Sequence, residues 1–414
     1  MGTYSGASML RALILSLLLS ASLSAQGKSF ASGLPALAQD KKDPPPPTPG
    51  VDEFKVEMAI KKGVEFLKTA KSPDFSKAYH NSDVLILWTF IHAGVPHDDP
   101  KFQALLQSCL GEALEKTYKV ALLAMCLEEI DRVKHQEKIA HCAQFLVDNQ
   151  CANGQWNYGS PTEFIKDLKV PAPPKDVASG GGKATKTASG KPKVVQHVAV
   201  KKMKEGPPDG DNSNSQYAAL GLRACFESGV DIPENVIVLA VKWWREAQHL
   251  DPKKDKDGKE IKPPVASGIS GKIEGWNYKR EGSDERAPYH AMTAGGVGSL
   301  LIYNYMLGRN SKSDSFVKAG LNWLTVHYQV QAWNTYFMYG LERAGIYAGE
   351  EKLGDHEWYK DGALALLGAQ GPNGAWGKDT EWFNTTWDTC FAILFLRRAA
   401  RPLVATESGG KLKK

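Results

Sequence analysis

Apolar residues recur at helical spacing in one class of segment along the chain. Val56, Ile60, Val64 and Leu67 follow the i, i+4, i+7 rhythm that places apolar side chains on one face of a helix. The same spacing recurs in segments 139–146, 236–243, 316–323 and, more loosely, 358–367. We predict an amphipathic helix in each of these segments.

A second class of segment is apolar on every side. A helix of that composition has no face suited to water, so neighbouring elements must cover it all round. The six segments of this class are VLILWTFI (84–91), VALLAMCL (120–127), YAALGLRACF (217–226), AMTAGGVGSLLIYNYML (291–307), TYFMYGL (335–341) and TCFAILFL (389–396).

The two classes alternate, and no strand-like alternation or βαβ rhythm appears. Repeats of this kind cannot bury their apolar surface alone and must stack on neighbours. We therefore predict an all-α fold, an α/α toroid of six helix pairs in two concentric helical rings, within one domain over residues 53–402. An open solenoid is the alternative. The predicted pairs cover residues 53–94, 101–131, 136–228, 234–308, 314–348 and 356–400.

The first 25 residues have the pattern of a signal peptide. An apolar run over residues 12–25 follows the basic Arg11, is too short to span a bilayer, and ends in small residues that offer a cleavage site before Gln26. We predict export to the periplasm or secretion. Residues 26–52, which contain PPPPTP, are predicted to form a Pro-rich linker. No later stretch is uniformly apolar over ~18 residues, so no transmembrane segment is predicted.

Charge is unevenly distributed along the chain. There are 51 basic and 46 acidic residues, a net charge of +5, but residues 166–204 hold ten Lys against two Asp and contribute +8. The rest is slightly acidic, which does not suit nucleic acid as a partner. Residues 166–208 are poor in large apolar groups and are predicted to be a disordered basic insert. We predict a long loop over 251–272 and a basic tail over 403–414.

The cysteines do not form a disulfide framework by their spacing, since no CxxC motif is present. Cys126, Cys142, Cys225 and Cys390 lie inside apolar helical patterns, where buried free thiols are expected. Export would permit disulfides, and Cys142 is near enough in sequence to Cys151 to pair with it.

Three predicted amphipathic helices end in a similar motif. QCANGQW (150–156) and QGPNGAW (370–376) both read Q-x3-G-x-W, and a third copy runs from Gln248 across the 251–272 insertion to Gly275-Trp276. Asn-Gly suits a tight turn with glycine at positive φ. The Gln amide can hydrogen-bond the turn backbone, and Trp can cover the end of a neighbouring helix. We interpret the motif as a structural staple between repeats.

This motif resembles the QW motif of squalene–hopene and oxidosqualene cyclases, in the wider terpenoid-cyclase and protein-prenyltransferase toroid family. The resemblance covers residues 53–400. Segments DNSNSQYA (211–218), YGLERAG (339–345) and HEWYKDGA (356–363) look like those of exported bacterial proteins with prenyltransferase/squalene-oxidase repeats. The resemblance implies a central cavity for a small hydrophobic, isoprenoid-like ligand and does not by itself imply an activity.

Cyclases of the protonating class carry D-x-D-D just before an inner helix, with the third position as the general acid. Asp209-Gly-Asp211-Asn212 is similar, but Asn212 stands where the family has its last Asp. Protonation of an alkene needs an unusually acidic carboxyl group prepared by its neighbours, and one neighbour is missing here. The alternative is that Asp211 or Ser213 caps the helix.

Protein prenyltransferases hold zinc with an Asp-x-Cys pair and a distant His. Asp388-Thr-Cys390 is similar to the pair, but no His follows it, so the third ligand would have to come from an earlier residue such as His290. The alternative is that Asp388 caps its helix and Cys390 lies in the core. His290 is also a candidate acid/base, or a hydrogen-bonded core residue. We predict no metal.

Glycosidases and polysaccharide lyases on α/α barrels place carboxylates and aromatic rings at the N-terminal ends of inner helices. Aromatic rings with two or three acids suit a carbohydrate, whereas core packing and helix caps are the alternative. The residues of this kind at the predicted ends are Asp83, Asp211, Tyr289, His290, Trp333, Asn334, Tyr336, Trp387 and Asp388.

We therefore predict an exported toroid that binds a ligand, isoprenoid-like or glycan, in its central cavity. No cofactor is predicted, since the glycines at 295–298 do not follow a strand as a dinucleotide motif would. Binding is favoured because no complete catalytic set is present. The alternative is an enzyme, either terpenoid cyclase/isomerase-like or carbohydrate-active, at the N-terminal mouth of the inner helices. Candidate catalytic residues are Asp211, His290 and Asp388, and candidate cavity residues are Asn212, Asn214, Gln216, Tyr217, Tyr289, Trp333, Asn334, Tyr336 and Trp387.

Overall fold

Helices dominate the part of the chain that the structure, a computed structural model, describes. That part comprises residues 47–70, 82–171, 191–251, 269–279, 287–380, 384–404 and 410–413, all within one unit of residues 39–414. The all-α prediction is confirmed for these residues. The predicted signal peptide, most of the linker and residues 252–268 of the predicted loop lie outside them.

Each of the six predicted ranges corresponds to one amphipathic helix and one helix that is mostly apolar. We call the apolar set the inner helices: α3 (Asp83–Ala93), α5 (Thr117–Asp131), α8 (Asn212–Glu227), α10 (His290–Met306), α12 (Thr335–Ala348) and α14 (Thr385–Leu396). The amphipathic set, the outer helices, comprises α1 (Glu53–Thr69), α4 (Pro100–Gly111), α6 (Gln136–Asp148), α9 (Glu234–Glu246), α11 (Ser315–Val326) and α13 (Trp358–Ala369). Two short 3-10 helices, η2 (Glu163–Ile165) and η4 (Ser311–Ser313), lie between them.

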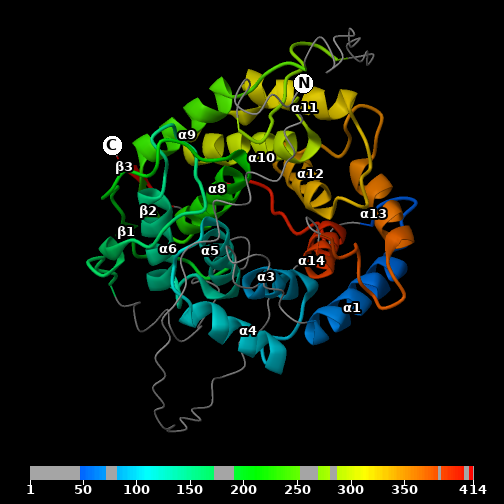
Figure 1. Ribbon diagram of the computed structural model, residues 1–414, viewed down its shortest axis with the longest axis horizontal. Helices are drawn as coiled ribbons and strands as arrows, with labels where there is room; N and C mark the ends of the chain where they lie inside the picture. The colour runs from blue at the N-terminus through cyan, green and yellow to red at the C-terminus, as the bar shows by residue number, and fades with distance from the viewer. Residues whose placement is uncertain are drawn as a thin grey trace, which may run out of the picture. The chain divides into compact units, whose positions relative to one another are not determined.

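The inner helices contact one another in chain order, from α3 to α14, and α14 then contacts α3. Each outer helix packs against one or two inner helices from outside this circuit, as Figure 1 shows. Burial follows the same division. α14 buries every residue from Asp388 to Leu396, whereas α1 buries only the stripe formed by Val56, Ala59, Ile60, Gly63, Val64 and Leu67. The hydrophobic pattern therefore assigns each helix to its set.

The three Gln–Trp motifs join successive outer helices at their ends. In each copy the Gln side-chain amide donates to a backbone carbonyl in the first half of the next outer helix, and the Trp indole donates to a carbonyl near the end of its own. The Gln bonds are Gln150 to Val236 (2.7 Å), Gln248 to Phe316 (2.9 Å) and Gln370 to Ala59 (2.8 Å). The Trp bonds are Trp156 to Leu146 (2.7 Å), Trp276 to Trp244 (2.7 Å) and Trp376 to Leu366 (2.8 Å).

The same corners also hold the inner helices. The backbone N–H of each motif Trp donates to a hydroxyl in the first turns of the inner helix that follows, namely Ser215 (3.0 Å), Thr293 (3.1 Å) and Thr389 (3.0 Å). Each corner therefore ties two outer helices to one inner helix, and these bonds are made by groups away from water. The geometry agrees with a structural staple and extends it to a hydroxyl that the motif does not include.

Residues 191–208 differ from the expectation of a disordered insert. They lie along α6, whose side chains hydrogen-bond the backbone of the segment: Gln136 Nε2 to Gln196 O (2.8 Å), Gln144 Nε2 to Lys201 O (2.6 Å) and Met203 N to Asp148 Oδ1 (2.8 Å). Val194, Val198 and Val200 are buried. A segment with few apolar residues is ordered here because polar side chains of a neighbouring helix satisfy its backbone. Residues 172–190 lie outside the described residues.

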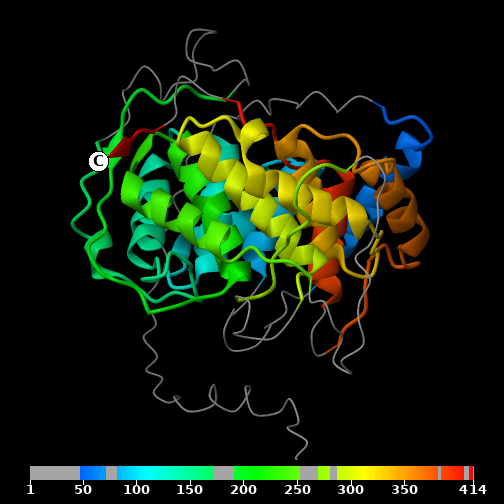
Figure 2. The ribbon, with the colours of Figure 1, turned by 90° about the horizontal axis from the view of Figure 1, so that it is seen from above.

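A small parallel sheet orders part of the predicted basic tail. The strand order is β1 (Val198–Ala199), β2 (Val230–Pro233) and β3 (Leu412–Lys413), and Figures 1 and 2 place it at the edge of the helical unit. The buried Asp231 accepts from Lys411 N (2.7 Å), from the Lys413 ammonium (3.0 Å) and from His197 Nδ1 (3.0 Å). This carboxylate therefore anchors residues 411–413 to the connection between α8 and α9.

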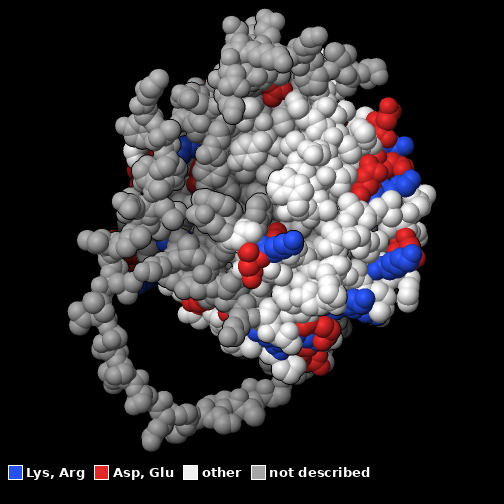
Figure 3. Space-filling model, turned by 45° about the vertical axis from the view of Figure 1, so that its right-hand side comes forward, with Lys and Arg blue, Asp and Glu red and all other residues white. Residues whose placement is uncertain are grey.

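Three further observations bear on the predictions made from composition. No helix within the described ranges is both long and apolar enough to cross a membrane. All six cysteines are buried free thiols, so Cys142 and Cys151 do not pair. On the face shown in Figure 3, acidic and basic side chains lie beside one another among uncharged ones.

The corner geometry predicts opposite effects for two Gly→Ala substitutions. Gly154 has φ +96° in the first Gln–Trp motif, and a Cβ there would overlap the Leu239 carbonyl of α9. We expect Gly154→Ala to lower the free energy of unfolding by at least about 1–2 kcal/mol from backbone strain alone. Gly368 is exposed in α13 with open space beside it, so Gly368→Ala should raise that free energy by up to about 1 kcal/mol. Chemical denaturation of both variants measures this, and equal effects would contradict the role of the corner.

Candidate functional site

A pocket lies between the C-terminal ends of four inner helices. Its wall includes Trp88 of α3, Glu128 and Glu129 of α5, Arg223 and Glu227 of α8, Tyr339, Arg343 and Tyr347 of α12, and residues 399–401 after α14. The pocket and the solvent at its opening together account for about 450 Å³ of empty space.

One wall of the pocket is a stack of aromatic rings and a guanidinium group. The Trp88 indole donates to the Tyr339 hydroxyl (2.9 Å), and the Arg343 guanidinium lies 3.8 Å from the centre of the Tyr339 ring. Arg343 is only 4% exposed. Burial raises the pKa of Tyr339 to about 12, so its hydroxyl stays neutral at physiological pH. The wall thus presents aromatic surface and one positive charge.

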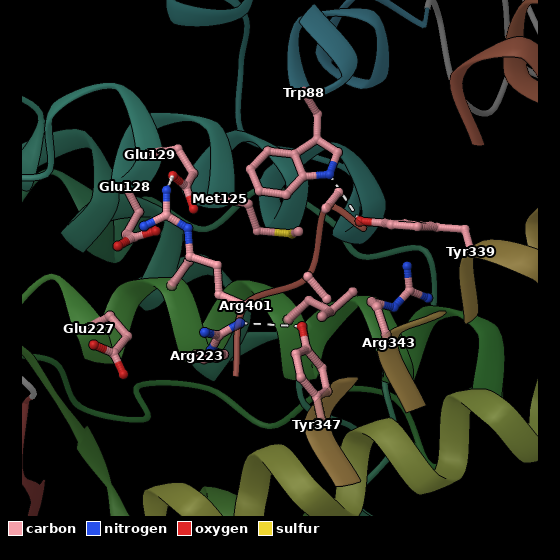
Figure 4. A pocket seen from close by; sticks show the side chains of 14 residues that line it. Trp88, Met125, Glu128, Glu129, Arg223, Glu227, Tyr339, Arg343, Tyr347 and Arg401 are labelled. Atoms are coloured by element: carbon pink, nitrogen blue, oxygen red, sulfur yellow. Dashed lines mark hydrogen bonds and ion pairs between the residues drawn. The ribbon is translucent and has the colours of Figure 1, made fainter. Parts of the chain in front are cut away.

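A second guanidinium group faces the same pocket from α8. Arg223 Nη1 donates to the Tyr347 hydroxyl (3.2 Å), and its guanidinium lies 5.3 Å from the centre of the Tyr347 ring. Figure 4 shows Arg223 and Tyr347 joined below Arg401, with Arg343 on the side of the pocket away from the glutamates.

The three glutamates of the pocket already have partners. Glu128 and Glu129 both pair with Lys191, Glu128 also lies 3.7 Å from Arg132, and Arg401 donates to Glu129. Glu227 accepts from the Tyr305 hydroxyl. Glu128 and Glu129 are therefore paired with cations at the edge of the pocket, while Glu227 is hydrogen-bonded to a neutral hydroxyl.

Beneath the pocket a buried polar network continues along the inner helices. Arg343 Nη2 donates to Gln216 Oε1 (3.3 Å), Gln216 Nε2 donates to the Tyr336 hydroxyl (2.5 Å), and that hydroxyl also bonds Ser213 (2.9 Å). Tyr217 lies with its ring 6.4 Å from that of Tyr336. Three predicted cavity residues, Gln216, Tyr217 and Tyr336, therefore lie together and connect to the pocket through Arg343.

Asp211 occupies the N-cap of α8. Its two carboxylate oxygens accept from the Asn214 backbone N–H (2.7 Å) and the Asn214 side-chain amide (2.8 Å). Burial raises its pKa, and the bonds from Asn214 oppose that shift. This is the capping alternative that the sequence left open.

His290 begins α10 and is held by a carbonyl group. Its Nε2 lies 2.7 Å from the His327 carbonyl oxygen, and its ring meets Trp323 and Phe337 edge to face. Burial lowers its pKa, which favours the neutral imidazole with Nε2–H as the donor. This is the arrangement of a hydrogen-bonded core histidine.

Asp388 is not the cap of α14, because Asn384 fills that position and accepts from Thr386 N (2.9 Å). Asp388 Oδ1 accepts from the Thr335 hydroxyl (2.7 Å), while Oδ2 is buried without a hydrogen-bond partner. Burial raises the pKa of this carboxyl to about 6. Cys390 is buried nearby in the core of the same helix.

Most of the other predicted residues hold loops and helix ends. Asn212 accepts from the Trp243 indole (2.8 Å) and donates to Asn277 O (2.9 Å), and Asn214 bonds Asp211. Asn334 caps α12 through Phe337 N (3.1 Å), and Ser108 donates to Asp83 (2.7 Å). Tyr289 N donates to Trp276 O (3.0 Å), Trp387 donates to Ser82, and Trp333 is 63% exposed.

The pocket lies at the opposite ends of the inner helices from the predicted mouth. Asp211, His290 and Asp388 each bond a different partner, and no hydrogen bond or ion pair joins any two of them in the described structure. The sequence analysis missed Trp88, Arg223, Arg343 and Tyr347. A signal existed for Arg223, which interrupts the apolar segment 217–226, whereas Arg343 follows Glu342 just after the apolar segment 335–341. A charged residue in such a segment must be buried, and therefore needs an explanation.

The described residues contain no group of three or more His, Cys, Asp or Glu side chains placed to hold a metal ion. No family model matches the sequence. No curated protein matches it either. Membership of the toroid family stays a prediction from the sequence motifs.

The environment of Asp388 predicts a pH-dependent stability. Since its pKa rises from 3.8 to about 6 on folding, the folded state binds more protons than the unfolded state between about pH 4 and 6, and stability falls as pH rises through that window. Asp388→Asn removes the effect and keeps an acceptor for Thr335. We expect its free energy of unfolding, relative to wild type, to rise by about 2–3 kcal/mol between pH 4 and pH 7.

Urea unfolding at both pH values measures this difference. The same substitution at the exposed Asp355 controls for the loss of one negative charge. A constant difference between Asp388→Asn and wild type at the two pH values would contradict a raised pKa.

Proposed function

We propose that the chain is an exported α/α toroid of six helix pairs, similar to squalene-cyclase-like repeat proteins, that binds a small ligand in its central cavity. The observation that carries the proposal is the pocket between the C-terminal ends of the inner helices, where aromatic rings and two arginines face a common space. Aromatic and apolar walls with a few fixed polar groups are the usual features of a ligand site.

The closed ring is supported by two independent observations. The inner helices contact their neighbours in a circuit from α3 back to α3. The last Gln–Trp corner reaches the first outer helix, since Gln370 of the α13 end bonds Ala59 of α1. An open solenoid would leave its first and last repeats without a mutual contact.

Binding is favoured over catalysis because the candidate acids and base already have structural partners. Asp211 caps α8, His290 bonds a carbonyl, and Asp388 bonds Thr335 at a carboxyl group enclosed by protein. The pocket wall of Trp88, Tyr339 and Tyr347 suits a ligand with an apolar or aromatic body. A glycan is the other ligand class, and the experiment below distinguishes the two.

Export rests on the pattern of residues 1–25. Fractionation of producing cells and N-terminal sequencing of the mature protein test it. Recovery of the mature chain outside the cytoplasm, shortened near residue 26, is the expected result.

A pocket-filling substitution tests ligand binding. Ala400 lines the pocket, and its role in the backbone is a hydrogen bond from its N–H to Glu342 (2.8 Å), which a larger side chain leaves in place. We expect Ala400→Trp to lose most of the ligand that co-purifies with the wild type, since the indole occupies the space. Native mass spectrometry and extraction of the purified protein measure the bound material and identify it as an apolar molecule or a glycan.

Val238→Trp is the matched control, because Val238 is exposed on α9, an outer helix. It should retain the ligand at the wild-type level. Equal ligand content in Ala400→Trp and wild type would move the site away from this pocket, and an absence of bound or extractable ligand in all three proteins would count against the proposed function.

A further inference from the structure

Two arginines of the pocket, Arg343 and Arg223, differ from four other arginines of the described structure in lacking a carboxylate partner. Arg132, Arg245, Arg397 and Arg401 each lie within 4.0 Å of a carboxylate, on Glu128, Asp314, Glu57 and Glu129 respectively. Within the described ranges, no carboxylate forms an ion pair with Arg343 or Arg223. Removing a charge from water without an opposite charge is costly, so a group that compensates these two cations is expected.

Arg343 is the stronger of the two anchors. Its neighbours are the Gln216 amide and the rings of Tyr339 and Tyr217, all uncharged groups. Nη1 is buried and has no hydrogen-bond partner, although the side chain lines the pocket. A guanidinium group carries five N–H donors in a planar fork, and this one leaves part of that fork unused.

Arg223 supports the same conclusion from the facing helix. It bonds only the Tyr347 hydroxyl, and its Nε is buried without a partner. The carboxylates of Glu227 and Glu128 act on it from a distance but form no ion pair with it. Glu128 instead pairs with Lys191 and Arg132, and Glu227 accepts from Tyr305.

We infer that the pocket holds the oxyanion of its ligand, a carboxylate or a phosphate, against Arg343 and Arg223. Planar guanidinium groups match the geometry of both oxyanions. The inference rests on the proposed function and specifies the ligand as a small organic anion whose apolar or aromatic body packs against Trp88, Tyr339 and Tyr347.

Because of the helix ends that surround the pocket, an anion bound there depends on the two arginines. The pocket lies at the C-terminal ends of α5, α8 and α12, where the helix dipoles place partial negative charge. Backbone amides therefore supply little attraction for an anion here. The affinity must come from Arg343 and Arg223, so their substitution should affect binding strongly.

Three probe molecules, each titrated into the full-length protein, test whether the pocket binds an anion and whether that anion is a carboxylate or a phosphate. Benzoate carries a carboxylate on an aromatic ring, benzyl alcohol is its uncharged counterpart, and inorganic phosphate carries the alternative oxyanion. Calorimetric titration and thermal shift measure their binding. We expect wild type to bind benzoate or phosphate, benzyl alcohol more weakly by tenfold or more, and added salt to weaken the anion.

The variants are Arg343→Met and Arg343→Lys, with Arg397→Met as the control. Arg397 pairs with Glu57 at the end of α14 and does not line the pocket. We expect Arg343→Met to weaken anion binding by about tenfold or more. Arg343→Lys keeps the charge but loses the planar fork, so it should bind at an intermediate level, while Arg397→Met should bind as wild type does. Circular dichroism verifies that each variant is folded.

The wild-type titrations decide the inference even if Arg343→Met fails to fold. Equal affinity for benzoate and benzyl alcohol would overturn the oxyanion inference and leave ligand binding in place. Anion binding that Arg343→Lys and Arg397→Met weaken equally would overturn the assignment to Arg343. If none of the probes binds but an uncharged ligand is recovered from the purified protein, the oxyanion inference fails and the proposed function stands.

Discussion

The structure depends on the burial of six helices that have no polar face. Residues on every side of α3, α5, α8, α10, α12 and α14 are buried, so each of these helices needs neighbours all round. The outer helices cover one side, and the circuit of inner helices covers the others. The Gln–Trp corners then fix how one repeat follows the next, because a single residue pair there bonds backbone carbonyls of two outer helices and a side-chain hydroxyl of one inner helix.

The burial of the inner helices also constrains the polar groups that lie among them. Gln216, Tyr336, Arg343 and Arg223 lie among helices that are otherwise apolar, where an unpaired polar atom is costly. Arg343, Gln216 and Tyr336 bond one another in a chain, and Arg223 bonds Tyr347. The atoms left without a partner include Nη1 of Arg343 and Nε of Arg223, two side chains that line the pocket.

The sequence predicts the helices well because their apolar patterns are long and regular. The six ranges, the two classes and the motif corners all follow from residue spacing, and the positive φ of Gly154 and Gly374 follows from Asn-Gly. The order of residues 191–208 could not be predicted, since it comes from Gln136, Gln144 and Asp148 of a distant helix. Nor could the order of residues 411–413, which depends on the buried Asp231.

For the site, the sequence predicted Gln216, Tyr217 and Tyr336 as cavity residues and a mouth at the N-terminal ends of the inner helices, whereas the pocket lies toward the opposite ends. Polar residues at helix N-termini can be taken for catalytic groups in a sequence. In the structure, Asp211 and Asn334 cap their helices. More informative positions were Arg223, inside an apolar segment, and Arg343, just after one. The role of these arginines depends on which carboxylates lie near them in the folded protein, and the sequence alone does not show this.

The bond from Gln370 to Ala59 spans 311 residues of sequence. The first helix pair therefore cannot acquire its last neighbours until α13 and α14 have been synthesised, and a chain that stops before them leaves the apolar sides of α3 and α12 uncovered. Contacts of such high sequence separation slow folding and expose aggregation-prone surface meanwhile. The fold is therefore complete only when the last two helices are present. A nascent chain that stays unfolded until its C-terminal end has been synthesised would satisfy this condition.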